Sequence, residues 1–154
     1  MVSIRESEPS DISDIVAVVN CAFAVEKFFI AKDRTHEKEI AAMRTRGIFL
    51  LAEEDGALLA CVWLELKQDR AYFGLLSVDP SQQKRGLGRT LVTAVEDRAK
   101  AAGCGVMDIR VVNLRTELPP FYESLGYRIT ATEPFSEPEA TSLPCHFLLM
   151  SKPL

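Results

Sequence analysis

Residues 71–102 contain three consecutive signals that constrain the fold more than any other part of the chain. The run Ala71–Val78 is apolar and predicts a buried strand. A turn containing Gly86 and Gly88 then leads into a helix whose apolar residues share one face. A strand, a glycine turn and a helix in this order direct backbone amides at an anion such as a phosphate.

The composition is typical of one globular domain. Of the 154 residues, 47% are hydrophobic and 26% are charged, and a chain of this length can bury a stable core. No apolar run approaches the roughly 20 residues that a membrane helix needs. Arg5 and Glu6 lie where a signal peptide would be apolar. We therefore expect a single domain over residues 1–154, in the cytoplasm, with no membrane partner.

Charge and cysteine spacing narrow the range of ligands. The net charge of −4 argues against a nucleic-acid partner. The one basic cluster, Lys84, Arg85 and Arg89, suits a small polyanion instead. The four cysteines lack CxxC spacing, so we expect buried apolar residues, no disulfide and no metal. They are Cys21, Cys61, Cys104 and Cys145.

The hydrophobic pattern predicts an α/β (α+β) chain with a mixed, mostly antiparallel central sheet of about six to seven strands and about four flanking helices. The expected strands cover residues 2–5, 48–53, 57–67, 71–78, 106–112, 127–132 and 146–151. The expected helices cover residues 12–23, 35–46, 86–102 and 119–125. Because a helix separates strand 71–78 from strand 106–112, these two strands are expected to be parallel, through a right-handed crossover.

Particular residues mark the boundaries of these elements. Asp55-Gly56 between two apolar runs predicts a hairpin. Ser10 or Asp11 is expected to cap the first helix, and Gly47 is expected to end the second as its C′ residue. That second helix has few apolar residues, so we expect it to line a cleft. The loop 133–144, rich in proline and acids, is a candidate rim of the site.

Three kinds of phosphate-binding turn are possible at Gly86-Leu87-Gly88. A P-loop requires Gly-Lys-Ser/Thr, which the chain lacks. A dinucleotide fingerprint requires a third glycine where the chain has Leu91. Asp108 lies about 20 residues further on, as the ribose-binding acid of that fingerprint does, but it is expected in the middle of its strand. The third kind is a coenzyme A pyrophosphate turn.

The hexapeptide Gln83-Lys84-Arg85-Gly86-Leu87-Gly88 resembles the Q/R-x-x-G-x-G/A signature of the GNAT superfamily, the acyl-CoA-dependent N-acyltransferases. The preceding LSVDP, residues 76–80, is similar to that family's L-x-V-x-P strand end. The segment FYESLGY, residues 121–127, resembles its [LF]-Y-x-x-x-G-[FY] ending. The expected element order is similar to the family fold over essentially the whole chain, including a splayed pair of parallel strands that binds coenzyme A.

The resemblance implies an acetyl-CoA site in two parts. Backbone amides from Lys84 to Arg89, which include those of Arg85, Gly86, Leu87 and Gly88, would close on the pyrophosphate at the start of a helix. The backbone of Leu76, Ser77 and Val78 would pair with the pantetheine arm. The Val78 N–H would then point at the thioester carbonyl as an oxyanion donor.

The resemblance also assigns two side chains. Tyr122 would be the general acid that protonates the leaving thiolate, and it would contact the cofactor. Asn113 would bond to the pantetheine or to the adjacent helix. Asn113 lies nine residues before Tyr122, two more than in many members of the family, with Pro119-Pro120 between them.

No general base emerges from the sequence. Many family members carry a carboxylate on the strand before the glycine turn, but Ala71–Val78 contains no acid. A water relay to an unassigned acid is therefore expected. The other candidates are Glu26, Glu65, Asp108, His36 and His146.

The leading functional hypothesis is an acetyl-CoA-dependent N-acetyltransferase that acts on a small amine by direct attack in a ternary complex. The acceptor is expected between the second helix and the loop 133–144, whose Glu133, Glu137 and Glu139 can attract a cation. An acetyltransferase of protein N-termini or lysines, and an acyl-CoA-binding regulatory module without turnover, remain open alternatives. The family also makes a homodimer possible.

Overall fold

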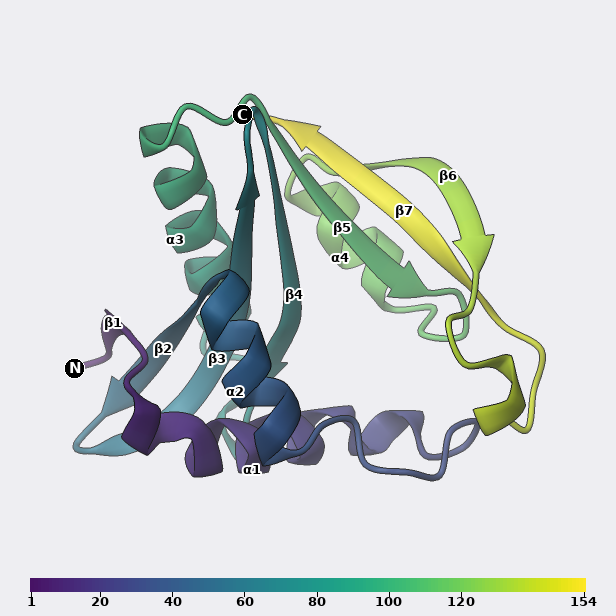
Figure 1. Cartoon of the computed structure of the whole chain (residues 1–154), viewed down its shortest axis with the longest axis horizontal. Helices are drawn as coiled ribbons and strands as arrows, with labels where there is room; N and C mark the ends of the chain where they lie inside the picture. The colour runs from purple at the N-terminus through teal and green to yellow at the C-terminus, as the bar shows by residue number, and fades with distance from the viewer.

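The structure, a computed structural model that describes residues 1–154, is built on one seven-stranded sheet (Figure 1). The strand order is β1-β2-β3-β4-β5-β7-β6. The strands are β1 (Ser3–Glu6), β2 (Ile48–Glu54), β3 (Ala57–Lys67), β4 (Arg70–Val78), β5 (Val106–Val112), β6 (Arg128–Pro134) and β7 (His146–Pro153). Apart from β4 and β5, all neighbouring strands are antiparallel, which confirms the predicted fold class.

Two layers of helices cover the two faces of the sheet. The helices are α1 (Ile12–Ala22), α2 (Glu37–Arg46), α3 (Leu87–Ala101) and α4 (Leu118–Ser124), and four short 3-10 segments include η2 (Phe23–Glu26) and η4 (Pro138–Ala140). One apolar core joins α3 and α4 to the sheet, and a second joins α1 and α2 to it. No helix has both the length and the apolar character needed to cross a membrane.

The pairing of β4 with β5 is parallel, as predicted, but short. It covers only Arg70–Tyr72 against Val106–Asp108, at the start of both strands. Further along, β4 contains an extra residue relative to β3, and Leu75 adopts a left-handed φ of 53°. The Ser77 hydroxyl donates a hydrogen bond of 2.9 Å to the Leu75 carbonyl and so supports this bulge. Beyond Tyr72 the two strands diverge, and a gap opens between them (Figure 1).

Gly47 ends α2, as predicted, but glycine is required there for a different reason than in an ordinary C′ position. Gly47 does follow α2, but its φ of −162° is extended rather than left-handed. A Cβ at this position would lie 2.2 Å from the Leu64 carbonyl oxygen and 3.0 Å from the Trp63 indole nitrogen. Glycine is needed because the start of β2 approaches β3 closely.

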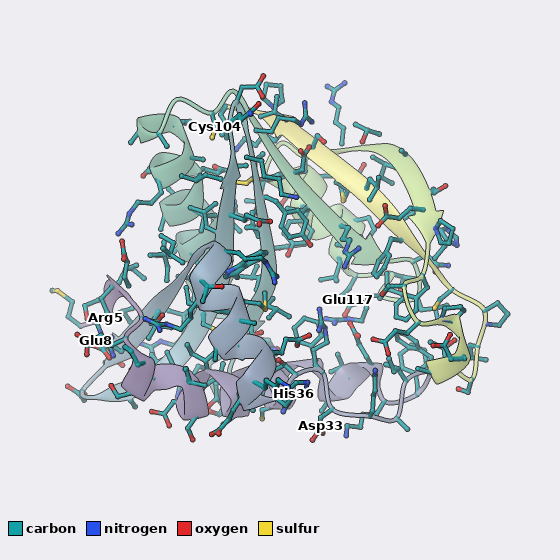
Figure 2. All side chains as sticks on the ribbon, viewed as in Figure 1. Arg5, Glu8, Asp33, His36, Cys104 and Glu117 are labelled. Atoms are coloured by element: carbon teal, nitrogen blue, oxygen red, sulfur yellow. The ribbon has the colours of Figure 1, made fainter.

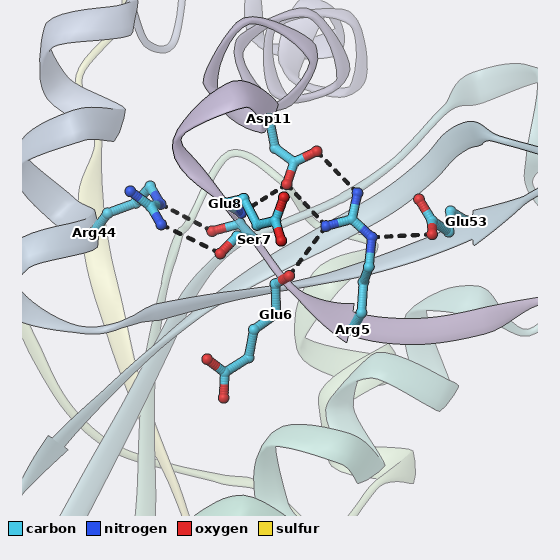
Figure 3. Close-up of polar contacts among 7 residues, drawn as sticks. All are labelled: Arg5, Glu6, Ser7, Glu8, Asp11, Arg44 and Glu53. Carbon is cyan, nitrogen blue, oxygen red and sulfur yellow. Dashed lines mark hydrogen bonds and ion pairs between the residues drawn. The ribbon is translucent and has the colours of Figure 1, made fainter.

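Asp11 occupies the N-cap position of α1, as predicted. Its side chain, however, makes no capping hydrogen bond to the helix. Its carboxylate instead accepts two hydrogen bonds of 2.9 Å from Arg5, and one of 2.7 Å from the Glu8 amide (Figure 3). Arg5 also donates to Glu53 on β2 at 3.0 Å. This polar cluster ties β1 to both β2 and the start of α1.

The expectation that all four cysteines are buried holds for two of them. Cys61 and Cys104 are buried, Cys145 is half-buried and Cys21 is exposed on α1. Cys21 lies in the apolar sequence NCAF, but the helix turns it away from the sheet, so flanking composition alone misplaced it.

Candidate active site

The end of β4 presents a free edge toward the gap between β4 and β5. The Asp79 amide donates to the Leu59 carbonyl on β3 at 2.8 Å. Because consecutive amides of a strand point to opposite edges, the Val78 N–H points away from β3, toward the gap. No strand partner is present on that side beyond Tyr72. The position predicted for the oxyanion donor is therefore an amide directed into open space.

The glycine turn lies directly after this edge, at the start of α3. Lys84 and Gly86 have left-handed φ angles of 69° and 75°, a backbone arrangement that gathers successive N–H groups into an anion-binding concavity. No atom lies within 4 Å of the place where a Cβ on Gly86 would be. A Cβ on Gly88 would be 3.7 Å from the Phe121 ring and 3.9 Å from the side chain of Val78. The turn therefore lies beside both the free edge and α4, and it fits a pyrophosphate.

The three basic side chains near the turn are not equivalent. The Arg85 guanidinium donates to Gln82 at 2.7 Å and to the Glu54 carboxylate at 3.1 Å. Lys84 and Arg89 form no ion pair in the structure and are exposed. These two, rather than the side chain of Arg85, are available to an incoming phosphate.

Tyr122 lies on α4, and its side chain is buried against Phe73 and Tyr127. Burial raises the pKa of its hydroxyl above the ordinary range, while the positive charge of Arg115 lowers it. The hydroxyl makes no hydrogen bond to the protein. Every side-chain oxygen or nitrogen that is fully buried does have a hydrogen-bond partner, so the Tyr122 oxygen itself is not fully buried. The Tyr122 hydroxyl is therefore open to the cavity that this residue lines.

Two adjoining cavities occupy the gap. The first, of about 430 Å³, lies between the free edge of β4, the end of β5, α4 and the segment between α1 and α2. We call it the inner cavity. The second, of about 700 Å³, lies between α2 and strands β3 to β7, and we call it the outer groove. Both include Tyr72, Gly74 and Arg110, so the two spaces meet at β4.

Glu26 is a buried acid of the inner cavity, with 8% of its surface exposed. Its carboxylate accepts a hydrogen bond of 2.9 Å from Arg115, which also donates to Glu117 at 2.9 Å. Burial raises the Glu26 pKa, although Arg115 opposes that shift. Figure 2 shows Glu117 above the segment that carries Asp33 and His36. The sequence offered Glu26 only as one candidate among five, since its partner lies 89 residues away.

The other candidate bases are occupied or placed elsewhere. Asp108 accepts hydrogen bonds from Arg70 and Ser151, and Glu65 pairs with Lys67 at 3.5 Å. Both lie in the outer groove. His36 caps the start of α2, and His146 is exposed at the start of β7.

The acids of the loop 133–144 are largely neutralised. Glu133 pairs with Arg110 at 3.0 Å, and Glu137 pairs with Lys32. Asn113 has a structural contact, because its side-chain oxygen accepts the His146 amide at 2.8 Å and its own amide donates to the His146 carbonyl. Asn113 thus clamps the end of β5 to β7.

Comparison with known proteins agrees with this arrangement. The sequence profile of the acetyltransferase (GNAT) family matches residues 16–127, which include the free edge, the glycine turn and Tyr122. The chain belongs to the GNAT family. Its relatives include the uncharacterized protein YdhI of Bacillus subtilis, 26% identical over 62% of this chain and 58% of YdhI. The mycothiol acetyltransferase of Beutenbergia cavernae is 35% identical over 47% of this chain but only 25% of that protein.

Solved structures show the same GNAT fold over the whole chain. The ribosomal-protein-S18-alanine N-acetyltransferase of Escherichia coli superposes with a TM-score of 0.81 at 21% identity, over 99% of this chain and 94% of that one. YncA of Salmonella typhimurium, solved with its cofactor acetyl-CoA, has a TM-score of 0.78 at 22% identity, over 99% and 94% of the two chains. The predicted family resemblance is confirmed.

Proposed function

We propose that this GNAT chain transfers an acetyl group from acetyl-CoA to a primary amine, by direct attack in a ternary complex. The observation that carries the proposal is the free edge of β4, which runs from the glycine turn to the cavity of Tyr122. Membership of the family supports the activity. The acetyl-CoA bound to YncA supports the choice of donor.

The residues proposed to hold acetyl-CoA form a continuous strip. The backbone of Leu76, Ser77 and Val78 would pair with the pantetheine amides in place of a strand. The turn would bind the pyrophosphate through its amides and through Lys84 and Arg89, at the positive end of α3. The full set of proposed contacts is Leu76, Ser77, Val78, Lys84, Arg85, Gly86, Leu87, Gly88, Arg89, Asn113 and Tyr122.

Two groups are proposed to act on the reacting atoms. The Val78 N–H would stabilise the negative charge that develops on the thioester oxygen. Tyr122 would protonate the leaving thiolate. Because burial raises the Tyr122 pKa, the hydroxyl holds its proton at neutral pH until the thiolate forms. The positive charge of Arg115 lowers that pKa and therefore eases the transfer.

The acceptor is proposed to be a small amine that reaches the inner cavity through the outer groove. The relation to mycothiol acetyltransferases favours a small molecule. The second candidate is the amino end of a peptide, because the outer groove of about 700 Å³ has more room than a small amine fills. The free Tyr122 hydroxyl disfavours a module that binds acyl-CoA without turnover.

The first test measures thiol release from acetyl-CoA with spermidine, kanamycin, free amino acids and an alanine-ended peptide. We expect turnover with at least one of them. Tyr122→Phe should lower kcat roughly 100-fold or more, with little change in acetyl-CoA affinity. Binding of acetyl-CoA without turnover of any amine would support the regulatory module instead, and equal kcat in the variant would remove Tyr122 from the reaction.

The second test addresses the turn. The protein leaves room for a Cβ at Gly88, so Gly88→Val should fold with nearly unchanged Tm. The valine side chain would extend toward Phe121 and Val78, where the turn meets the end of β4, and we expect loss of acetyl-CoA binding by calorimetry. A variant that binds acetyl-CoA as the wild type does would refute the placement of the pyrophosphate.

A further inference from the structure

Glu26 differs from every other acid of the inner cavity in its exposure. Its side chain is 10% exposed, whereas those of Asp33, Glu39 and Glu137 are 69%, 40% and 50% exposed. Those three acids have partners near the surface, in Lys27, Arg34 and Lys32. Charged side chains are rarely buried unless they are paired or have a functional role. The burial of Glu26 therefore requires an explanation.

The pairing of Glu26 accounts for only one of its two oxygens. Oε2 accepts from Arg115 at 2.9 Å, and Oε1 has no hydrogen-bond partner in the protein. Since no fully buried side-chain oxygen or nitrogen lacks a partner, Oε1 must have contact with the cavity. Arginine–carboxylate pairs often use both oxygens, and this one leaves an acceptor free.

Arg115 connects this carboxylate to the other reactive group of the cavity. It holds Glu26 at 2.9 Å, and its charge partly opposes the rise that burial causes in the Tyr122 pKa. Arg115 itself is held by Glu117, on the loop that leads into α4. The carboxylate, the half-buried guanidinium and the phenol therefore line one cavity.

The surroundings of Glu26 favour proton uptake by its carboxylate more than those of an exposed glutamate do. Burial raises the Glu26 pKa, which makes the carboxylate more basic than an exposed one. Glu117 acts in the same direction, while Arg115 and Arg34 keep the carboxylate ionised. A catalytic base works best when its pKa lies near the working pH.

We propose that Glu26 is the catalytic base that takes a proton from the ammonium group of the acceptor, with Arg115 as its positioning residue. The inference rests on the proposed acetyltransferase function. It fills the role that the sequence left unassigned, because β4 carries no acid in the gap.

With Glu26 as the base and Tyr122 as the acid, every proton in the reaction is accounted for. The acceptor ammonium gives one proton to the Glu26 carboxylate, which releases it to solvent. The free amine forms the C–N bond with the thioester carbonyl carbon, and the C–S bond breaks. The thiolate takes the Tyr122 proton, and the second proton of the former ammonium restores Tyr122. The products are the acetamide, the coenzyme A thiol and one proton.

The test compares Glu26→Gln with the wild type, using the best acceptor of the panel above. The glutamine keeps the shape of the side chain but cannot accept the proton. We expect kcat/KM at pH 7 to fall roughly 100-fold or more. We also expect its pH profile to change: the wild-type rate should be nearly level around neutrality, whereas the variant should gain about tenfold per pH unit as the fraction of free amine grows.

Two controls separate this role from a structural one. Asp33→Asn removes an exposed acid from the same cavity and should stay within about twofold of the wild type. Acetyl-CoA affinity of Glu26→Gln should also be unchanged, which would show that the cofactor site remains folded. Glu26→Asp should recover part of the rate and the level pH profile. A Glu26→Gln variant that loses rate only through KM, and keeps the wild-type pH profile, would make Glu26 an anchor and overturn the proposal.

A measurement without any acceptor tests the proposal separately from the proposed function. In protein labelled with 13C at the glutamate carboxyls, the Glu26 signal is identified by its absence in Glu26→Gln. We expect it to titrate at a higher pH than an ordinary exposed glutamate carboxyl. A carboxyl that stays protonated from pH 5 to 9 cannot be the base. If Glu26 titrates as expected but no amine is acetylated, the proposed acetyltransferase function is refuted. The raised pKa of the Glu26 carboxyl would still stand.

Discussion

Cys61 and Tyr127 are buried side chains that hold their protons in the folded protein. Burial raises the pKa of Cys61 to about 12, and burial together with the neighbouring Glu96 raises the pKa of Tyr127. In the unfolded chain these groups lose their protons near pH 8.5 and 10. The folded state binds more protons at alkaline pH, so the free energy of unfolding should fall there, by up to about 1.4 kcal/mol per pH unit and group.

Urea unfolding between pH 7.5 and about 11 measures this loss. Cys61→Ala should be less stable at neutral pH, because it leaves a small cavity, but its stability should decline less steeply above pH 8.5. Tyr127→Phe should alter the curve only above pH 10. If Cys61→Ala and the wild type lost stability in parallel between pH 8.5 and 10, the thiol would not be the group that holds the proton.

At this same scale of single residues, the sequence predicted backbone positions better than side-chain partners. Gly88 and Tyr122 were placed by motifs whose residues are close in sequence, and in the structure Gly88 lies beside Val78 at the end of β4 and Tyr122 lines the inner cavity. The pairing of Glu26 with Arg115 depends on how two distant segments pack, and no local pattern encodes such a contact. The contact between Arg85 and Glu54 was missed for the same reason.

At the scale of elements, Gly47 at the junction between α2 and β2 allows β2 to pack closely against β3, and a substitution there tests this packing. A Cβ at Gly47 would lie 2.2 Å from the Leu64 carbonyl, so Gly47→Ala must push β2 away from β3. We expect a cost of about 1–3 kcal/mol, which corresponds to a fall in Tm of roughly 2–12 °C for a chain of this size. Differential scanning calorimetry gives the Tm directly.

Gly105→Ala is the matched control, because no atom lies within 4 Å of its Cβ position and its φ is not left-handed. Its free energy of unfolding should change by no more than about 0.5 kcal/mol, so its Tm should stay close to that of the wild type. A loss in Gly105→Ala equal to that in Gly47→Ala would show that chain entropy, and not the close approach of β2 to β3, decides the effect.

Most element boundaries followed from periodicity and turn residues, since these are local properties. The strand Val106–Val112 was predicted with its observed ends, and β2, β3 and β4 differ by a residue at most. The second helix begins two residues later than expected, because His36 rather than an earlier residue caps it. The bulge at Leu75 had no signal in the residues themselves, since leucine rarely adopts a left-handed φ.

The whole molecule consists of two half-sheets joined at one end. Strands β1 to β4 and strands β5 to β7 share only the short pairing at Arg70–Tyr72, reinforced by the Arg70–Asp108 ion pair at 2.7 Å. A ligand that pairs with the free edge of β4 adds contacts to both halves. We therefore expect coenzyme A at 100 times its Kd to stabilise the fold by about 2.7 kcal/mol, roughly 5–10 °C in Tm.

Hydrogen exchange locates that stabilisation. The amides of Leu76 and Val78 should exchange more slowly with coenzyme A present, whereas amides of β1 should respond less. Gly88→Val should show neither the thermal shift nor the added protection. Protection confined to α3, with no change at Val78, would mean that the pantetheine arm does not lie along β4.

The far end of the gap is closed by contacts between segments that are distant in sequence. Ile30 forms a β-bridge with Thr141, the Ser142 amide donates to the Phe29 carbonyl at 2.8 Å, and Lys32 pairs with Glu137. In Figure 1 the segment after α1 meets the loop around η4 at the lower right. The chain thus forms a closed ring around the inner cavity. We therefore expect an acceptor to enter this ring end first, so that the perimeter of the ring, set by the lengths of two loops, limits which amines can be acetylated.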